Sequence, residues 1–211
     1  MFPSAEIERI LRLSPVMPVV VIEEAELAPD LARALVRGGI RTVEITLRTP
    51  AALAAIEAIA RHVPEIAVGA GTVLAAEDLR AAARAGATFA ISPGATPALL
   101  STAASVPIPY LPAVATASEL MAGLAAGYQC FKFFPAGPAG GIAMLKAFAG
   151  PFPQARFCPT GGITQESVGS YLDLPNVLCA GGSWLSPADA LAARDWKRIE
   201  TLASRAAASR T

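Results

Sequence analysis

Eight short apolar runs alternate with alanine-rich segments from Pro18 onward, and this alternation limits the possible folds more than any other feature. The runs are rich in Val, Ile, Phe and Cys, so we expect buried strands at 18–22, 42–47, 66–71, 88–92, 109–114, 130–134, 156–160 and 177–181. A helical pattern follows each run. Strands that alternate with helices are typical of a parallel α/β sheet.

Eight strand–helix units are the number that closes a barrel, and about 24 residues per unit leave room only for short loops. An open doubly wound sheet is the alternative, but no G-x-G-x-x-G follows the first strand, and "GAGTVLAAEDL" lacks the third glycine. We therefore predict one (β/α)8 TIM barrel domain over residues 1–211. Residues 1–17 are expected to form an extra N-terminal helix and its lead-in.

The charge pattern disfavours several classes of protein. The formal net charge is zero, which leaves no basic footprint for nucleic acid or for a membrane surface. The long uncharged region 85–118 is interrupted by five prolines, so we expect buried elements rather than a membrane span. Charges near the N-terminus disfavour a signal peptide.

Three cysteines match no zinc spacing, and their odd number argues against a disulfide framework. We therefore expect reduced core thiols in a cytoplasmic protein. A chain with a single histidine also offers no obvious ligand set for a catalytic metal ion, so no metal is predicted.

Strand alternation directs two ionisable side chains into the predicted barrel. Val43 and Ile45 belong against the helices, which turns Glu44 inward; Phe131 and Phe133 likewise turn Lys132 inward. A buried ion pair that fixes strand register is one interpretation. A nucleophilic amine beside an acid/base group is the other.

Lysine usage favours the catalytic interpretation. The chain has three lysines and fourteen arginines, yet it places Lys132 at its most buried basic position. An arginine cannot lose its proton there, whereas a desolvated lysine can.

Two glycine pairs, at 161–162 and 181–182, are expected to follow the last two strands. Loops at these places form the recurrent phosphate site of the barrel fold, and Ser183 adds a hydroxyl donor. Ordinary glycine turns are the alternative. Arg48 and Thr72 are expected at the same mouth, where they could hold a substrate carboxylate.

A set of motifs, in order through nearly the whole chain, resembles the 2-keto-3-deoxy-6-phosphogluconate aldolase and 4-hydroxy-2-oxoglutarate aldolase family of class I, Schiff-base enzymes. They are "VEITLRTP", "VGAGTVL", "AISPG", "LPAVATASE", "FKFFPA", "CPTGGI" and "AGGSWL". The resemblance implies that Lys132 forms the imine, Glu44 shuttles protons and Arg48 binds the pyruvyl carboxylate. It also implies that further residues line the pyruvate end (Thr72, Pro93, Phe134) or hold the phosphate (Thr160, Gly161, Gly162, Gly182, Ser183).

The expected activity is reversible cleavage of 2-keto-3-deoxy-6-phosphogluconate to pyruvate and glyceraldehyde 3-phosphate, the aldol step of an Entner-Doudoroff type of sugar-acid breakdown, by a homotrimer without a cofactor. The galactonate epimer and 4-hydroxy-2-oxoglutarate remain alternative substrates, although Thr160 favours the gluconate type. A pyridoxal phosphate enzyme would also use a lysine imine. A non-catalytic phosphate-binding barrel is the alternative from another class.

Overall fold

The computed structural model describes residues 3–209, in which strands and helices alternate. The strands are β1 (Val16–Val20), β2 (Thr42–Thr46), β3 (Ala67–Gly71), β4 (Phe89–Ile91), β5 (Tyr110–Leu111), β6 (Ala113–Val114), β7 (Cys130–Phe133), β8 (Arg156–Pro159) and β9 (Ala180–Gly182). The helices are α1 (Pro3–Leu11), the 3-10 turn η1 (Ala25–Leu27), α2 (Ala28–Arg37), α3 (Ala52–His62), α4 (Ala76–Arg84), α5 (Pro97–Ala103), α6 (Ala117–Ala125), α7 (Gly141–Ala149), α8 (Val168–Leu172), α9 (Ala188–Ala192) and α10 (Trp196–Ala207).

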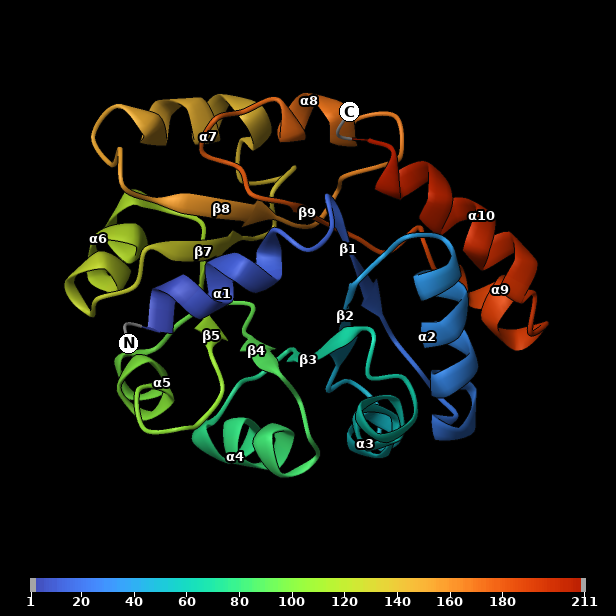
Figure 1. Cartoon of the computed structure of the whole chain (residues 1–211). Helices are drawn as coiled ribbons and strands as arrows, with labels where there is room; N and C mark the ends of the chain where they lie inside the picture. The colour runs from blue at the N-terminus through green and yellow to red at the C-terminus, as the bar shows by residue number, and fades with distance from the viewer. Residues whose placement is uncertain (1–2, 210–211) are drawn as a thin grey trace.

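Parallel pairing closes these strands into a ring, as predicted. One sheet runs β5-β4-β3-β2-β1-β9 and the other runs β6-β7-β8. A bridge between Thr160 and Gly181 joins the end of β8 to β9, and only Pro112 separates β5 from β6. Figure 1 shows α2 to α10 around the outside of the strands. The predicted (β/α)8 barrel is therefore confirmed.

Five of the eight predicted strands match the structure to within one residue at each end, and three differ by more. The expected fifth strand, 109–114, is divided at Pro112, because proline has no N–H to donate to a ladder. The first strand begins at Val16 rather than Pro18, since Val16 already pairs with Ala180 of β9. The last strand is Ala180–Gly182 rather than 177–181, so the second glycine pair lies within a strand and not in a loop after it.

Alternate strand residues pack into two separate apolar cores, as the strand parity predicts. Val43, Ile45, Phe131 and Phe133 belong to the core between the strands and the helices. Phe131 lies so close to α6 that only glycine fits at position 123. Because these bulky residues face the helices, the residues that alternate with them on the same strands face the barrel interior.

Helix α1 closes one end of the barrel. Ile7, Ile10 and Leu11 lie on one helical face and pack with interior residues of the strands, among them Met17 and Phe89. Figure 1 shows α1 crossing in front of the strands. Since all strands are parallel, their carboxyl ends meet at the opposite end, which α1 does not cover.

The N-terminus of α6 carries a reciprocal cap. The Glu119 N–H donates to Thr116 Oγ1 at 3.3 Å, and Glu119 Oε2 accepts from the N–H groups of Ala115 and Thr116 at 2.8 and 2.9 Å. The backbone N–H of Ala115 makes the largest contribution to lowering the pKa of the Glu119 carboxyl. This capping box fixes where the helix behind β7 begins.

Replacing Thr116 with Ala should lower the free energy of unfolding by about 1 kcal/mol, because one N–H at the helix start loses its acceptor. Urea denaturation measures the change as a shift of the midpoint. Ser118→Ala, at an exposed position of the same helix, is the control and should not destabilise the protein. An unchanged midpoint for Thr116→Ala would contradict the role of the cap.

Candidate active site

Lys132 and Glu44 meet inside the barrel. Lys132 lies on β7 and Glu44 on β2. With β5 and β6 counted as one divided strand, these strands are equally distant in both directions round the ring, so the two side chains must reach toward each other across the interior. The Lys132 Nζ lies 3.0 Å from Glu44 Oε1 and 3.2 Å from Oε2. The predicted meeting of amine and carboxylate is thus observed.

Both side chains of this pair are almost fully withdrawn from water, with relative exposures of 5% for Lys132 and 2% for Glu44. Among the side chains that the structure describes, these two are the only buried ones that carry a formal charge. A charge transferred to such an interior is costly unless a partner and hydrogen bonds compensate it. The direct contact supplies that compensation and also a short path for a proton between nitrogen and oxygen.

Apolar groups and buried thiols lie below this pair. Cys130 lies two residues before Lys132 on β7 and packs in the interior core with residues of α1. Burial is the largest cause of the rise in the pKa of its thiol to about 12, so Cys130 stays protonated near neutral pH. The thiols of Cys158 and Cys179 lie 3.4 Å apart, too far for a disulfide bond. The Lys132–Glu44 pair therefore lies directly above an apolar layer of the barrel interior.

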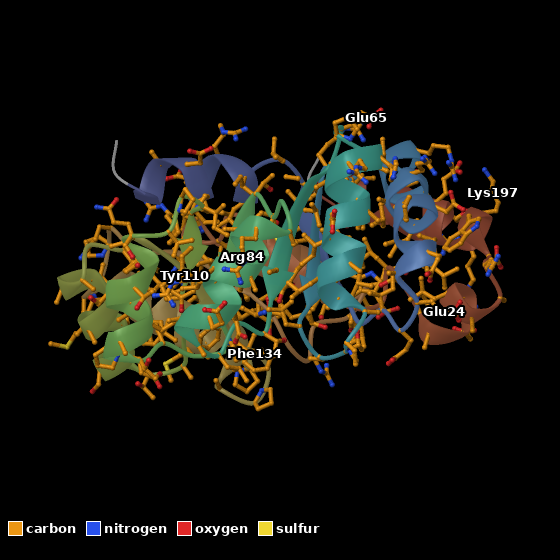
Figure 2. All side chains as sticks on the ribbon, turned by 90° about the horizontal axis from the view of Figure 1, so that it is seen from below. Glu24, Glu65, Arg84, Tyr110, Phe134 and Lys197 are labelled. Atoms are coloured by element: carbon orange, nitrogen blue, oxygen red, sulfur yellow. The ribbon has the colours of Figure 1, made fainter. Side chains whose placement is uncertain are left out.

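Phe134 connects the amine to the first glycine turn. The Lys132 Nζ lies 5.4 Å from the centroid of the Phe134 ring, within the range of a cation–π contact. A Cβ added at Gly161 would lie 3.2 Å from the same ring. Figure 2 shows Phe134 at the edge of the molecule opposite α1. These residues thus lie at the uncovered end of the barrel.

The backbone after β8 turns through its two glycines. Gly161 and Gly162 have φ values of +96° and +76°, which favour glycine. The N–H groups of Ala136 and Gly137 donate to the carbonyls of Thr160 and Gly161 at 2.8 and 2.9 Å. The loops after β7 and β8 are therefore tied together beside Phe134.

The second glycine pair was expected in a loop but lies in β9, where each glycine makes room for a neighbouring side chain. Gly181 pairs with Thr160, and a Cβ at position 181 would lie only 2.2 Å from Thr160 Oγ1. Position 181 must therefore lack a side chain for the buried Thr160 hydroxyl to lie there. Gly182 likewise leaves room for the Trp184 ring, which would lie 2.4 Å from an added Cβ. Sequence reasoning missed Trp184, since an aromatic residue after a strand is ordinary core material.

The remaining predicted residues follow the carboxyl ends of their strands. Arg48 lies just beyond β2; its side chain is exposed and its guanidinium has no hydrogen bond or ion pair within residues 3–209. Thr72 follows β3 with a φ of +58°, an outlier for a β-branched residue that no local sequence pattern predicts. Half-buried Pro93 and exposed Ser183 follow β4 and β9.

A hydrogen bond behind β4 supports the segment that carries Pro93. The hydroxyl groups of Ser92 and Tyr110 lie 2.5 Å apart, and both residues are buried. Burial raises the pKa of the Tyr110 phenol, so it stays neutral and available for this bond. Figure 2 places Tyr110 in the body of the molecule rather than at the end that carries Phe134.

Within residues 3–209, no group of three or more His, Cys, Asp or Glu side chains is arranged to hold a metal ion. None of the helices in the same range combines the length and the apolar character that a bilayer crossing requires.

Solved structures with the same architecture are similar to the chain over almost its whole length. The KDPG aldolase of Legionella pneumophila, with pyruvate captured as a covalent carbinolamine intermediate, has a TM-score of 0.93 and 49% identity, covering 95% of this chain and 98% of that one. The 2-keto-3-deoxy-6-phosphogluconate aldolase of Zymomonas mobilis ZM4, solved with 3-phosphoglycerate, has a TM-score of 0.94 and 47% identity, covering 98% and 97%.

Sequence comparison leads to the same group of proteins. The KHG/KDPG aldolase of Escherichia coli K12 is 54% identical over 199 residues, which are 94% of this chain and 93% of that relative. A family profile described as KDPG and KHG aldolase matches residues 7–202. The chain therefore belongs to the KDPG and KHG aldolase family.

Proposed function

We propose that this aldolase cleaves 2-keto-3-deoxy-6-phosphogluconate reversibly to pyruvate and glyceraldehyde 3-phosphate through an imine on Lys132. The buried contact of 3.0 Å between the Lys132 amine and the Glu44 carboxylate carries the proposal. A primary amine beside a proton acceptor, both shielded from water, is the arrangement that imine chemistry requires. Family membership supports the substrate class.

Imine formation uses both members of the pair. Transfer of a proton from Lys132 to Glu44 leaves a neutral amine, whose lone pair attacks the C2 carbonyl of the keto acid. The carbinolamine that forms then loses water, with Glu44 returning the proton that the departing hydroxyl needs. The resulting protonated imine withdraws electrons from the neighbouring carbon atoms.

Carbon–carbon cleavage follows from this electron withdrawal. Glu44 takes the proton of the C4 hydroxyl, the C3–C4 bond breaks, and its electron pair moves into an enamine on Lys132 as the aldehyde leaves. Glu44 then returns its proton to C3, and water hydrolyses the imine to pyruvate and the free amine. One carboxylate can perform every proton transfer because it contacts the reacting nitrogen directly.

The mouth of the barrel suits a substrate that is anionic at both ends. Arg48, with no partner among the described residues, is suited to the carboxylate of the pyruvyl part, beside Thr72, Pro93 and Phe134. Residues on the far side of the mouth (Thr160, Gly161, Gly162, Gly182 and Ser183) would hold the phosphate. The turn after β8 offers backbone N–H groups, and Ser183 offers an exposed hydroxyl.

The assembly and the compartment also belong to the proposal. Family resemblance supports a homotrimer, which light scattering coupled to size-exclusion chromatography would measure. The three buried cysteines support a reducing compartment, so we propose the cytoplasm.

Lys132→Ala should abolish turnover and also the borohydride-dependent attachment of pyruvate, because no amine remains to form the imine. Mass spectrometry of the reduced protein measures the adduct. Lys132→Arg keeps a cation beside Glu44 but cannot form the imine, so it should also be inactive. Lys146→Ala, at an exposed position on α7, should retain both properties.

Two results of this experiment would contradict the assignment. An adduct that persists on another residue of Lys132→Ala would show that Lys132 is not the nucleophile. A wild-type chain that binds phosphate esters but never acquires a pyruvate adduct would instead indicate a non-catalytic phosphate-binding barrel.

Glu44→Gln should lower kcat by roughly 10²–10⁴-fold, because the amide has a similar shape but accepts no proton. Steady-state kinetics measures this loss, and pyruvate trapping should slow in parallel. Glu57→Gln, on the exposed face of α3, is the matched control. A kcat within about threefold of wild type would mean that another group relays the protons.

The kcat/KM for the gluconate substrate should exceed that for its galactonate C4 epimer. The support is Thr160, a polar residue beside the first glycine pair, where relatives of the galactonate type tend to be apolar. Comparing both phosphorylated epimers with 4-hydroxy-2-oxoglutarate measures the preference. A higher value for the galactonate epimer would reverse the substrate assignment.

A further inference from the structure

Gly71 lies directly beside the carboxylate of Glu44. It is the last residue of β3 and pairs with Thr46 of β2, whereas Glu44 itself pairs with Gly69. The Glu44 side chain therefore leans along the strand direction and over the backbone of the neighbouring strand at position 71. Strand side chains commonly lean in this way.

No side chain fits at position 71 while Glu44 keeps this position. A Cβ built on Gly71 would lie 2.1 Å from Glu44 Oε1 and 2.5 Å from its Cγ, whereas real Cβ contacts are essentially never below 3.0 Å. The nearest atoms that the added carbon would meet all belong to Glu44. Gly71 is not among the glycines with positive φ, so alanine would be unfavourable because of Glu44 and not because of the backbone.

We propose that Gly71 is a positioning residue for the reaction, because it provides the space in which the Glu44 carboxylate lies against Lys132. A methyl group at position 71 would force Glu44 Oε1 to move by about 1 Å, and displacements of that size are enough to disrupt catalytic geometry. The two contacts of 3.0 and 3.2 Å to Lys132 Nζ would then be lost. This inference rests on the proposed function of Glu44.

Gly69, two residues earlier on the same strand, provides a structural contrast. A Cβ at position 69 would lie 2.2 Å from the ring of Phe89, which belongs to the apolar core beneath the site. Gly69 therefore makes room for packing, whereas Gly71 makes room for a charged group. Alanine at position 69 is expected to affect stability, and alanine at position 71 is expected to affect chemistry as well.

Gly71→Ala should lower kcat by about 100-fold or more, while the KM of the phosphorylated substrate changes by less than about threefold. The carboxylate and phosphate contacts proposed above come from other residues, so binding is retained while proton transfer fails. The rate of borohydride trapping with pyruvate should fall in parallel with kcat. Gly150→Ala, where an added Cβ meets nothing within 4 Å, is the control and should behave as wild type.

A double variant tests whether Gly71 acts through Glu44. Glu44→Ala removes the atoms that the new methyl group would meet, so Glu44→Ala/Gly71→Ala should have the same residual kcat as Glu44→Ala. Its Tm should equal or exceed that of Gly71→Ala. The Tm of Gly69→Ala, by contrast, should not be restored by Glu44→Ala, because its overlap is with Phe89.

The inference is overturned if Gly71→Ala retains wild-type kcat, or if the losses from Glu44→Ala and Gly71→Ala multiply in the double variant. Should Gly71→Ala alone fail to fold, recovery of a folded double variant supports the inference, and its failure overturns it. An error in the proposed function is recognised separately, since the wild-type chain would then show no pyruvate adduct on Lys132.

Discussion

The contact between Lys132 and Glu44 is the interaction on which the site depends. A buried amine and a buried carboxylate each carry a large desolvation cost, and each is tolerable because the other lies about 3 Å away. That distance exists because β2 and β7 face each other across a closed ring. An open sheet with the same strands would place the two residues on separated strands, and neither side chain could reach the other.

The two ends of the barrel differ in a way that serves this contact. Helix α1 brings Ile7, Ile10 and Leu11 onto the interior core at one end, so water is excluded from beneath the pair. At the other end, short polar and glycine-rich segments follow the strands, and the loops after β7 and β8 are held together by backbone hydrogen bonds. The reacting groups therefore lie between an apolar layer on one side and the open end of the barrel on the other, as an enzyme with a charged substrate needs.

Glycines inside the ring also serve the polar residues. Glu44 lies over Gly71 of the next strand, and Thr160 lies over Gly181 of the next strand. In both cases the missing side chain gives a polar group room to lie along the barrel wall instead of filling the centre. A substrate can occupy the centre only if the polar groups lie aside in this way.

Local sequence patterns predicted the alternating elements, the extra N-terminal helix and the inward direction of Glu44 and Lys132. These features depend on the two-residue period of strands and on burial of the larger apolar face. Boundaries were less accurate where pairing decides them: Pro112 divides a run that is apolar throughout, and Val16 joins β1 because Ala180 lies beside it. Gly181 and Gly182 were expected in a loop after the last strand for the same reason, since a glycine pair by itself does not distinguish a loop from a tightly packed strand.

The sequence by itself thus determined which residues could take part in the chemistry and toward which side each would point. Only the tertiary structure decided the distances between them, the φ of +58° at Thr72 and the glycine positions that accommodate Glu44 and Thr160. The physical reason is that side-chain direction follows from neighbours along the chain. Separation and available space, in contrast, depend on strands that are far apart in sequence and are brought together only by closure of the ring.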